Sequence, residues 1–389
     1  MRHIAKRITG SSPKNYGMFG KSCMIADRDL IHLELGQPVH DTPDIIKDAT
    51  IDALRAGKVH YSDLRGNADL RGALARKVET QNAIVATPEQ ILVTNGLTQG
   101  SFAALFSIID PGDEVILLEP YYPQHIGKIE LSGGVVIRAP LDASNGYSIN
   151  AASIETCISP RTKAIVLINP CNPTGRVYTR NELSDLAQLA IRHDLLVIAD
   201  EVYEQIVFDN AKHISIASLP GMAERTITLF AFTKAYAMDG WRIGYAVASP
   251  ALIDAMATVT ANEVTHVNNF IQYGALAAVE KGQDALAAML SEDKRRRDLT
   301  VHTLNQCPGV SCTLPEGTIY AFADISATRI PSQEIAEALL RDEGVVVEAG
   351  SFYGPAGEGH IRICFGAETA ERLEEALMRI RRFFNVLAS

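Results

Sequence analysis

Short apolar runs that each end near a turn or a polar cluster most constrain the fold of this chain. Between residues 90 and 232 they are "QILVTNG", "DEVILLEP", "GVVIRAP", "TKAIVLINP", "LLVIADEVY" and "TITLFAF". Helix-like segments such as "SFAALFSII" and "RNELSDLAQLAIRH" separate several of them. Strands that alternate with helices are typical of a mostly parallel sheet covered on both faces. The sequence therefore predicts an α/β fold.

The C-terminal third has a different pattern. Helical periodicity dominates residues 251–305, and strand-like pieces "TIYAFADI", "GVVVEAG" and "HIRICFG" precede a final helix, "AERLEEALMRIRRFF". This order favours a second, smaller α+β domain. We expect an N-terminal arm that is partly packed on the small domain, a large domain and a small C-terminal domain, with the bounds 1–43, 44–285 and 286–389.

Composition excludes several classes of protein. The 389 residues carry a formal net charge of −10, which argues against an extended nucleic-acid surface. The six cysteines show no CxxC spacing, so no metal or redox motif is indicated. Residues 91–109 are uncharged, but polar side chains interrupt them, which favours a buried strand and helix over a membrane span. The scattered cysteines and the lack of a signal-like apolar segment at residues 1–10 predict a cytoplasmic protein.

Polar residues follow four of the apolar runs. They are Asn95-Gly96-Leu97-Thr98 after "ILVT", the segment "NPCNPTG" at 169–175, Asp200 with Tyr203, and Lys234 with Arg242. Each feature also has an ordinary explanation when it is taken singly: "NPCNPTG" as a turn, Asp200 as a helix cap and Lys234 as a surface base. Because the carboxyl ends of parallel strands lie at one edge of a sheet, we expect these side chains to meet there.

Together these residues contain the parts needed to hold pyridoxal 5′-phosphate. The Lys234 amine can form a Schiff base with the cofactor aldehyde. The Asp200 carboxylate can keep the pyridine nitrogen protonated, so that the ring accepts electrons. Asn172 and Tyr203 can bond the ring oxygen. Arg242 and the amides of the Gly96–Thr98 turn can hold the phosphate.

The segments "NPCNPTG", "ADEVY" and "FTKAYAMDGWRIGY" occur in an order that resembles the class I/II aminotransferases of PLP fold type I, the aspartate aminotransferase superfamily. The resemblance extends from Gly36 to at least Arg362. It implies a large PLP-binding domain with a mostly parallel seven-stranded sheet between helices, and a smaller α+β domain. It also implies ping-pong transfer of an amino group from an L-amino acid to a 2-oxo acid, with Lys234, Asp200 and Tyr203 as catalytic residues.

The resemblance implies roles for four further residues. Tyr122 in "EPYYP" matches the aromatic residue that stacks on the cofactor ring, although an ordinary buried aromatic also fits. Arg362 matches the arginine that pairs with the substrate α-carboxylate, and an internal carboxylate is its alternative partner. Gly36 matches a loop whose backbone approaches the substrate. Tyr61 in "VHYSDLRG" matches a tyrosine that reaches the phosphate of a neighbouring subunit, which implies a homodimer with shared active sites.

The chain departs from the family pattern at Ala231, where many relatives carry a phosphate-binding serine. Either Thr98, Thr233 or water substitutes at the phosphate, or phosphate binding is weaker than in those relatives. The donor specificity stays open. The segment 61–66 resembles that of members acting on basic or neutral amino acids, although Asp63 also fits an ordinary turn. Phe106 stands where some dicarboxylate-specific relatives have lysine.

Three alternatives remain at this point. The same fold also supports β-lyases, synthases and decarboxylases. The segment "NYGMFGKS" at 15–22 nearly matches a phosphate-binding loop, but Asn15 replaces its first glycine and no apolar strand precedes it. A regulator of this fold would need a DNA-binding domain, for which the N-terminal arm is too short.

Overall fold

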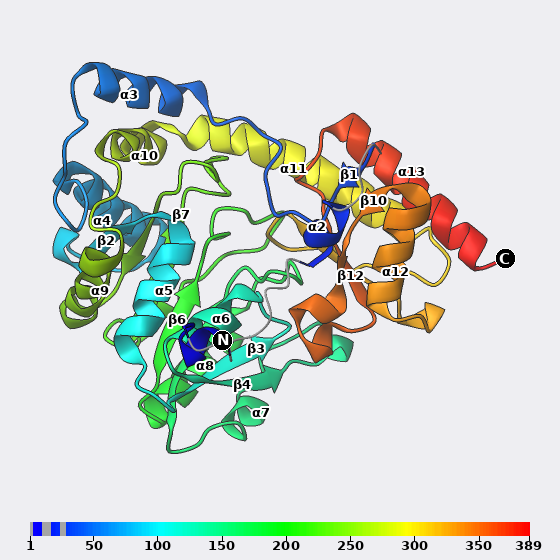
Figure 1. The fold of residues 1–389 in the computed structure, drawn as a ribbon, viewed down its shortest axis with the longest axis horizontal. Coiled ribbons are helices and arrows are strands. Elements are labelled where there is room, and N and C mark those ends of the chain that lie inside the picture. Colours follow the sequence, from blue (N-terminus) through cyan, green and yellow to red (C-terminus); the bar gives the residue numbers. More distant parts are fainter. Residues whose placement is uncertain (1–2, 10–16, 24–28) are drawn as a thin grey trace.

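A seven-stranded sheet forms the centre of the molecule (Figure 1). The computed structural model describes residues 3–9, 17–23 and 29–389. The strands are parallel except β8, which is antiparallel to both of its neighbours. In spatial order they are β2 (Ile91–Thr94), β8 (Gly244–Val247), β7 (Thr226–Ala231), β6 (Leu196–Asp200), β5 (Thr162–Ile168), β3 (Glu114–Glu119) and β4 (Val135–Pro140). The predicted α/β class and seven-stranded sheet are confirmed, but β8 was not among the apolar runs.

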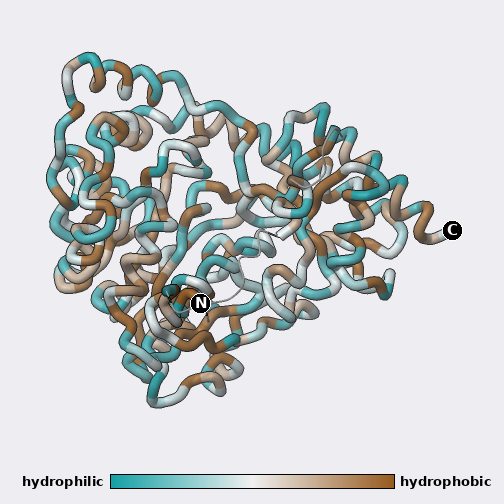
Figure 2. Tube along the Cα trace, in the orientation of Figure 1, coloured by the Kyte–Doolittle hydropathy of each residue, from teal (hydrophilic) through white to brown (hydrophobic). Residues whose placement is uncertain are grey.

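Helices cover both faces of this sheet. In β5, Ile165 and Leu167 pack with α8 (Arg180–Arg192), whereas Val166 packs with α5 (Gly96–Ile108) on the opposite face. Successive side chains of a strand point to opposite faces, so a strand that is covered twice must be apolar throughout. Figure 2 shows apolar residues along several of these strands. The uncharged segment 91–109 forms β2 and α5, which confirms the prediction of a buried strand and helix.

Local sequence signals set the ends of several helices. Before α8, the Thr179 hydroxyl accepts the Glu182 amide hydrogen at 3.3 Å, and the Glu182 carboxylate accepts the Thr179 amide hydrogen at 2.9 Å. This reciprocal cap satisfies two amides that would otherwise lack partners. The other helices around the large sheet are α3 (Asp44–Arg55), α4 (Ala68–Asn82), α6 (Gln124–Leu131), α7 (Ala151–Glu155), α9 (Pro250–Glu263) and α10 (Asn269–Lys281).

A second region of structure follows α11 (Gln283–Leu304). Its three-stranded antiparallel sheet has the order β11-β12-β9, and helices α12 (Ser332–Ala338) and α13 (Ala370–Leu387) pack nearby (Figure 1). The strands are β9 (Tyr320–Asp324), β11 (Glu348–Ala349) and β12 (His360–Cys364). The segment "GVVVEAG" is split, because β10 (Val345–Val346) pairs instead with β1 (Ile31–His32) in parallel. The predicted domain boundary at 285/286 falls within α11 and stays a prediction.

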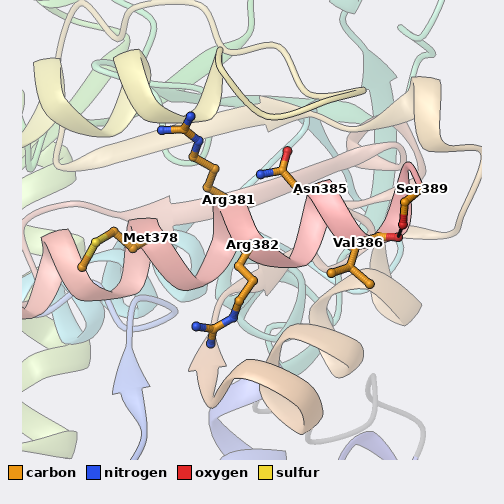
Figure 3. Close-up of a pocket in the computed structure, with 6 residues that line it drawn as sticks. All are labelled: Met378, Arg381, Arg382, Asn385, Val386 and Ser389. Atoms are coloured by element: carbon orange, nitrogen blue, oxygen red, sulfur yellow. Dashed lines mark hydrogen bonds between the residues drawn. The ribbon is translucent and has the colours of Figure 1, made fainter.

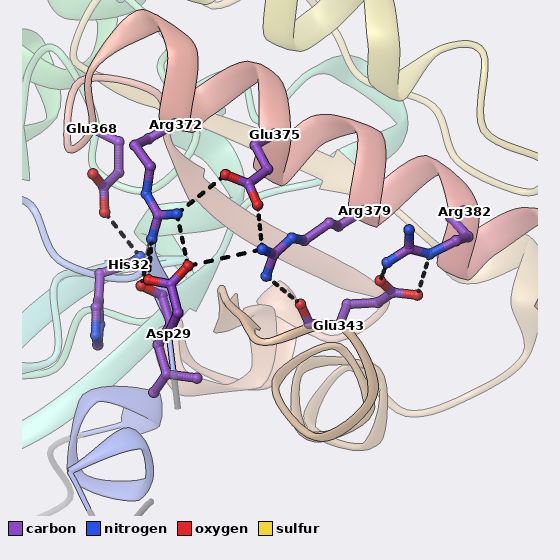
Figure 4. Close-up of polar contacts among 9 residues, drawn as sticks. Asp29, His32, Glu343, Glu368, Arg372, Glu375, Arg379 and Arg382 are labelled. Atoms are coloured by element: carbon purple, nitrogen blue, oxygen red, sulfur yellow. Dashed lines mark hydrogen bonds and ion pairs between the residues drawn. The ribbon is translucent and has the colours of Figure 1, made fainter. Parts of the chain in front are cut away.

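The N-terminal part of the chain returns to this second region. Besides the β1–β10 pairing, Arg372 on α13 donates to the Asp29 carboxylate at 2.8 and 2.9 Å (Figure 4). The His32 amide donates to the Glu368 carboxylate at 3.2 Å in the same network. Exposed ion pairs contribute little free energy individually, so the buried strand pairing is the stronger attachment.

Two short helices belong to the N-terminal arm, α1 (Lys6–Thr9) and α2 (Gly17–Ser22). The segment that resembled a phosphate-binding loop forms α2, apart from positions 15 and 16, which lie outside the described residues. The Lys21 amine forms an ion pair with the Glu337 carboxylate. The geometry therefore gives no support to a nucleotide site. None of the described helices is long and apolar enough to cross a membrane.

Candidate active site

A cavity of about 930 Å³ opens at the carboxyl ends of the large sheet's parallel strands. The second region and the N-terminal arm close its other side. Most of the residues singled out in the sequence line it: Gly36, Leu97, Thr98, Tyr122, Asn172, Asp200, Tyr203, Lys234, Arg242 and Arg362. A hollow along α13, lined by Met378, Arg381, Arg382, Asn385, Val386 and Ser389, contains none of them (Figure 3).

Lys234 follows β7 and reaches across the cavity to the N-terminal segment. Its Nζ donates a hydrogen bond to the main-chain oxygen of Gly36. A Cβ at Gly36 would lie 2.0 Å from the Tyr320 hydroxyl and 3.6 Å from Lys234 Nζ, so only glycine fits this approach. Burial lowers the pKa of Lys234 to about 8. The amine is thus available in its neutral, nucleophilic form close to neutral pH.

Asp200 lies at the end of β6, where its carboxylate contacts a buried histidine. Asp200 Oδ2 is 3.3 Å from His125 Nε2, and Oδ1 accepts the Val202 amide hydrogen at 3.3 Å. Burial lowers the pKa of His125, which favours the neutral ring as a hydrogen-bond partner. The sequence reasoning missed His125. Its only local signal is its spacing of three residues after Tyr122, on the first turn of α6.

The hydroxyl of Tyr203 has a tyrosine partner from the second region. Tyr203 Oη and Tyr320 Oη are 2.7 Å apart, and the two rings meet edge to face. Burial raises the pKa of both phenols, that of Tyr203 well above its usual value, so both hydroxyls are neutral donors. Tyr320 also was missed, because β9 reads as an ordinary buried strand.

Arg242 lies against the N-terminus of α5. Its backbone has a φ of 55°, and its Nη1 donates to the main-chain oxygen of Asp239 at 2.6 Å. A Cβ at Gly96 would lie 2.5 Å from Arg242 Nη2, which explains a glycine there. The guanidinium therefore adjoins the start of α5, and this is an arrangement that favours an anion. Thr233 lines the cavity near the position of Ala231, whereas Ala231 itself does not.

Arg362, on β12 of the second region, is another cation that lines the cavity. It is 5% exposed, and its Nη1 donates to Asn172 Oδ1 at 3.1 Å. Its Nη2 donates to the main-chain oxygen of Glu34, and its Nε has no partner among the described residues. The guanidinium lies over the Tyr320 ring, 4.2 Å from the centroid. No carboxylate of the described residues forms an ion pair with Arg362, so the alternative of an internal acidic partner is wrong for this conformation.

Tyr61 lies outside the cavity of its own chain. It is 85% exposed and stacks on His266, with ring centroids 4.5 Å apart. Phe106 is also outside the cavity, and its side chain is half exposed on α5. Asp63 accepts the Arg65 amide hydrogen at 2.7 Å, as a turn residue does.

The residues of the cavity fit pyridoxal 5′-phosphate. Two glycines leave room that a Cβ would fill, Gly36 beside Lys234 and Gly96 beside Arg242. Three kinds of group surround one space. They are the Lys234 amine with its lowered pKa, the Asp200 carboxylate in contact with buried His125, and the Arg242 guanidinium beside the start of α5. These groups match the aldehyde, the pyridine nitrogen and the phosphate of the cofactor, respectively.

Lys128, three residues after His125, is a buried lysine of the cavity wall that the sequence reasoning missed. Its Nζ donates to Ser101 Oγ at 2.6 Å, and no carboxylate of the described residues forms an ion pair with it. Burial lowers its pKa from 10.5 to about 8. Burial outweighs the attraction of the Asp200 carboxylate, so the charged form of Lys128 destabilises the folded state.

We therefore expect Lys128→Met to stabilise the protein at pH 7, by up to about 3 kcal/mol if the full pKa difference applies. The folded pKa lies below the unfolded one, so the cost of the charge is complete below pH 8 and disappears as the pH rises towards 10.5. Thermal unfolding of both proteins at several pH values measures this difference. A variant of equal stability at pH 7, or a difference that grows above pH 8, would contradict it.

Comparison with known proteins identifies a family. Residues 28–380 match the family model described as aminotransferase class I and II. The chain is 38% identical to an aspartate aminotransferase of Pyrococcus abyssi, covering 91% of this chain and 92% of that one. It is also 38% identical to an arginine–pyruvate transaminase of Pseudomonas aeruginosa, covering 90% and 89%. A solved aromatic aminotransferase of Pyrococcus horikoshii superposes with a TM-score of 0.90, at 36% identity and 95% and 99% coverage.

Proposed function

Because the chain belongs to the class I and II aminotransferases, which are pyridoxal-phosphate-dependent enzymes, we propose that Lys234 is the residue that binds the cofactor covalently and transfers the proton. One observation carries the proposal: Lys234, Asp200 and Arg362 come from separate segments and line one cavity. In this assignment Arg242 and the amides of Gly96–Thr98 hold the phosphate. The substrates are an amino acid and a 2-oxo acid.

The residues of the cavity divide the steps of the reaction in this assignment. The bound cofactor supplies the electron sink that makes the substrate α-carbon acidic. Arg362 holds the substrate α-carboxylate through a planar pair of donors, and thereby orients the α-carbon. Lys234 Nζ takes the proton from the α-carbon, for which a pKa of about 8 is well matched near neutral pH. Asp200, backed by His125, holds the proton of the pyridine nitrogen.

Borohydride reduction followed by peptide mapping tests the assignment of Lys234. The purified protein is expected to be yellow, and reduction should attach the cofactor to the peptide that contains Lys234. A cofactor found on Lys128 or on any other lysine would overturn the assignment. Incubation with an amino donor alone should yield the 2-oxo acid and pyridoxamine phosphate, whereas release of ammonia would indicate elimination instead.

Asp200→Ala is expected to lower turnover by roughly 100-fold or more, because the pyridine nitrogen loses the carboxylate that keeps it protonated. Folding should change much less, since the variant removes one side chain at the cavity wall. Steady-state kinetics with circular dichroism separates the two effects, and Asp185→Ala, an exposed carboxylate on α8, is the matched control. Near-normal turnover with unchanged cofactor would contradict the role of Asp200.

We also propose a homodimer in which Tyr61 completes the site of the neighbouring subunit. The exposure of Tyr61, 85%, and its distance from its own cavity support this arrangement. A cytoplasmic location accords with the free cysteines. The names of the relatives do not identify the amino donor of this chain, because they include aspartate, aromatic and arginine transaminases. Phe106 and Asp63 do not identify it either.

A further inference from the structure

Two carboxylates in the cavity have no part in the proposed chemistry. Glu34 and Glu348 both line it, and each is 3% exposed. Glu34 follows β1, and Glu348 begins β11. Carboxylates buried to this degree are usually paired with a cation or fully hydrogen-bonded. Their partners therefore decide whether the protein itself neutralises them.

The carboxylate of Glu34 is only half satisfied. Oε1 lies 2.9 Å from Nδ1 of His32, whose side chain is 37% exposed. Oε2 is buried and has no hydrogen-bond partner in the part of the chain that the structure describes. Burial raises the pKa of Glu34. An unpartnered acceptor in the wall of a cavity needs a donor that the described residues do not supply, from water or from a ligand.

The carboxylate of Glu348 has hydrogen-bond donors but no cation. Its oxygens lie 3.2 and 3.1 Å from the Met18 amide nitrogen, and Oε1 lies 3.2 Å from the Ala349 nitrogen. No basic side chain of the described residues forms an ion pair with it. Burial raises its pKa to about 7. Backbone amides thus hold the Glu348 carboxyl in place, and among the described residues no basic side chain lies within ion-pair distance of it.

Both carboxylates adjoin the residue that holds the donor. Glu348 faces Arg362 across the β11–β12 pair, and the main-chain oxygen of Glu34 accepts from the same guanidinium. Arg362 forms an ion pair with neither side chain, so it stays free for the α-carboxylate. A donor whose α-carboxylate is held by Arg362 and whose amino group lies near Lys234 must place its side chain against other residues of the cavity. Glu34 and Glu348 are among those residues.

We propose that Glu34 and Glu348 bind the side chain of an amino donor that carries a positive charge, so that basic L-amino acids are the preferred donors. This inference rests on the proposed function. An ammonium or guanidinium group supplies the donor that Glu34 Oε2 lacks and brings a positive charge between the two carboxyls. A neutral side chain brings no cation to the two carboxyls, whose burial then favours the protonated form, and an acidic side chain adds repulsion between like charges.

L-Lysine and L-norleucine provide a matched test, because they have equal chain lengths and differ in the terminal ammonium group. The wild-type kcat/KM should favour lysine by about 10-fold or more, and Glu34→Gln should lower that ratio by about 10-fold, as for the loss of a charge-assisted hydrogen bond. Glu348→Gln, which keeps an acceptor for Met18, should lower the ratio in the same direction. Glu374→Gln, an exposed position on α13, should leave it unchanged.

Calorimetric binding of 6-aminohexanoate and hexanoate tests the same site without turnover. The holoenzyme should bind 6-aminohexanoate more tightly, and Glu34→Gln should abolish the difference. A preference for norleucine or L-aspartate over lysine, or equal binding of the two acids, would overturn the inference while transamination of other donors keeps the proposed function. No reaction with any donor, together with labelling away from Lys234, would instead remove the proposed function.

Discussion

Lys234→Ala is expected to lower kcat by roughly 10⁴-fold or more, because one side chain serves as both the covalent anchor and the proton carrier. The cofactor should still bind, since the corner formed by Arg242 and the start of α5 is unchanged. Absorbance of the bound cofactor and single-turnover kinetics with an amino donor measure the two properties separately.

The control for this variant is Lys212→Ala, which removes an exposed lysine and should leave turnover intact. A small added primary amine should partly restore proton transfer in Lys234→Ala, because the cavity of about 930 Å³ has room beside the truncated side chain. Turnover within 10-fold of the wild type would show that another group carries the proton.

Arg362→Leu is expected to cost ~3–5 kcal/mol of transition-state stabilisation, the range for breaking a buried charged pair. The physical reason is that every donor carries the same α-carboxylate, and no carboxylate of the described residues occupies the guanidinium. The loss in kcat/KM should therefore be similar for all donors. Measuring kcat/KM for lysine, norleucine, L-aspartate and one aromatic donor decides this point.

Arg362→Lys separates charge from geometry at this position. It keeps the positive charge but not the planar pair of donors, so we expect an intermediate loss. A loss confined to donors with acidic side chains would place Arg362 in the side-chain pocket. An Arg362→Leu protein that does not fold would favour a structural role, in which the stacking on Tyr320 and the bond to Asn172 matter most.

These expectations place the chemistry on residues that the sequence itself identified. Lys234, Asp200 and Asn172 follow apolar runs, and the carboxyl ends of parallel strands meet at one edge. Their convergence was therefore predictable once the runs had been read as a parallel sheet. The strand β8 was not predicted, because its four residues directly follow the Arg242 motif and lack a turn signal of their own.

The second region was predicted less completely. The run "GVVVEAG" reads as one strand, but its two halves pair with different partners, β1 and β12. The local pattern of the run predicts an extended backbone. It does not predict which strand the run pairs with, because β1 and β10 lie more than 300 positions apart along the chain. No periodicity within the run contains that information.

The sequence alone predicted the fold class, the family and most of the strand-end residues that line the cavity, because apolar periodicity and strand-end motifs are local properties. Only the tertiary structure brought His125 to Asp200, Tyr320 to Tyr203, and Glu34 and Glu348 to Arg362. The physical reason is desolvation: a side chain's charge state and its free acceptors depend on which distant segments exclude water from it. That information is absent from the residues next to it in the chain.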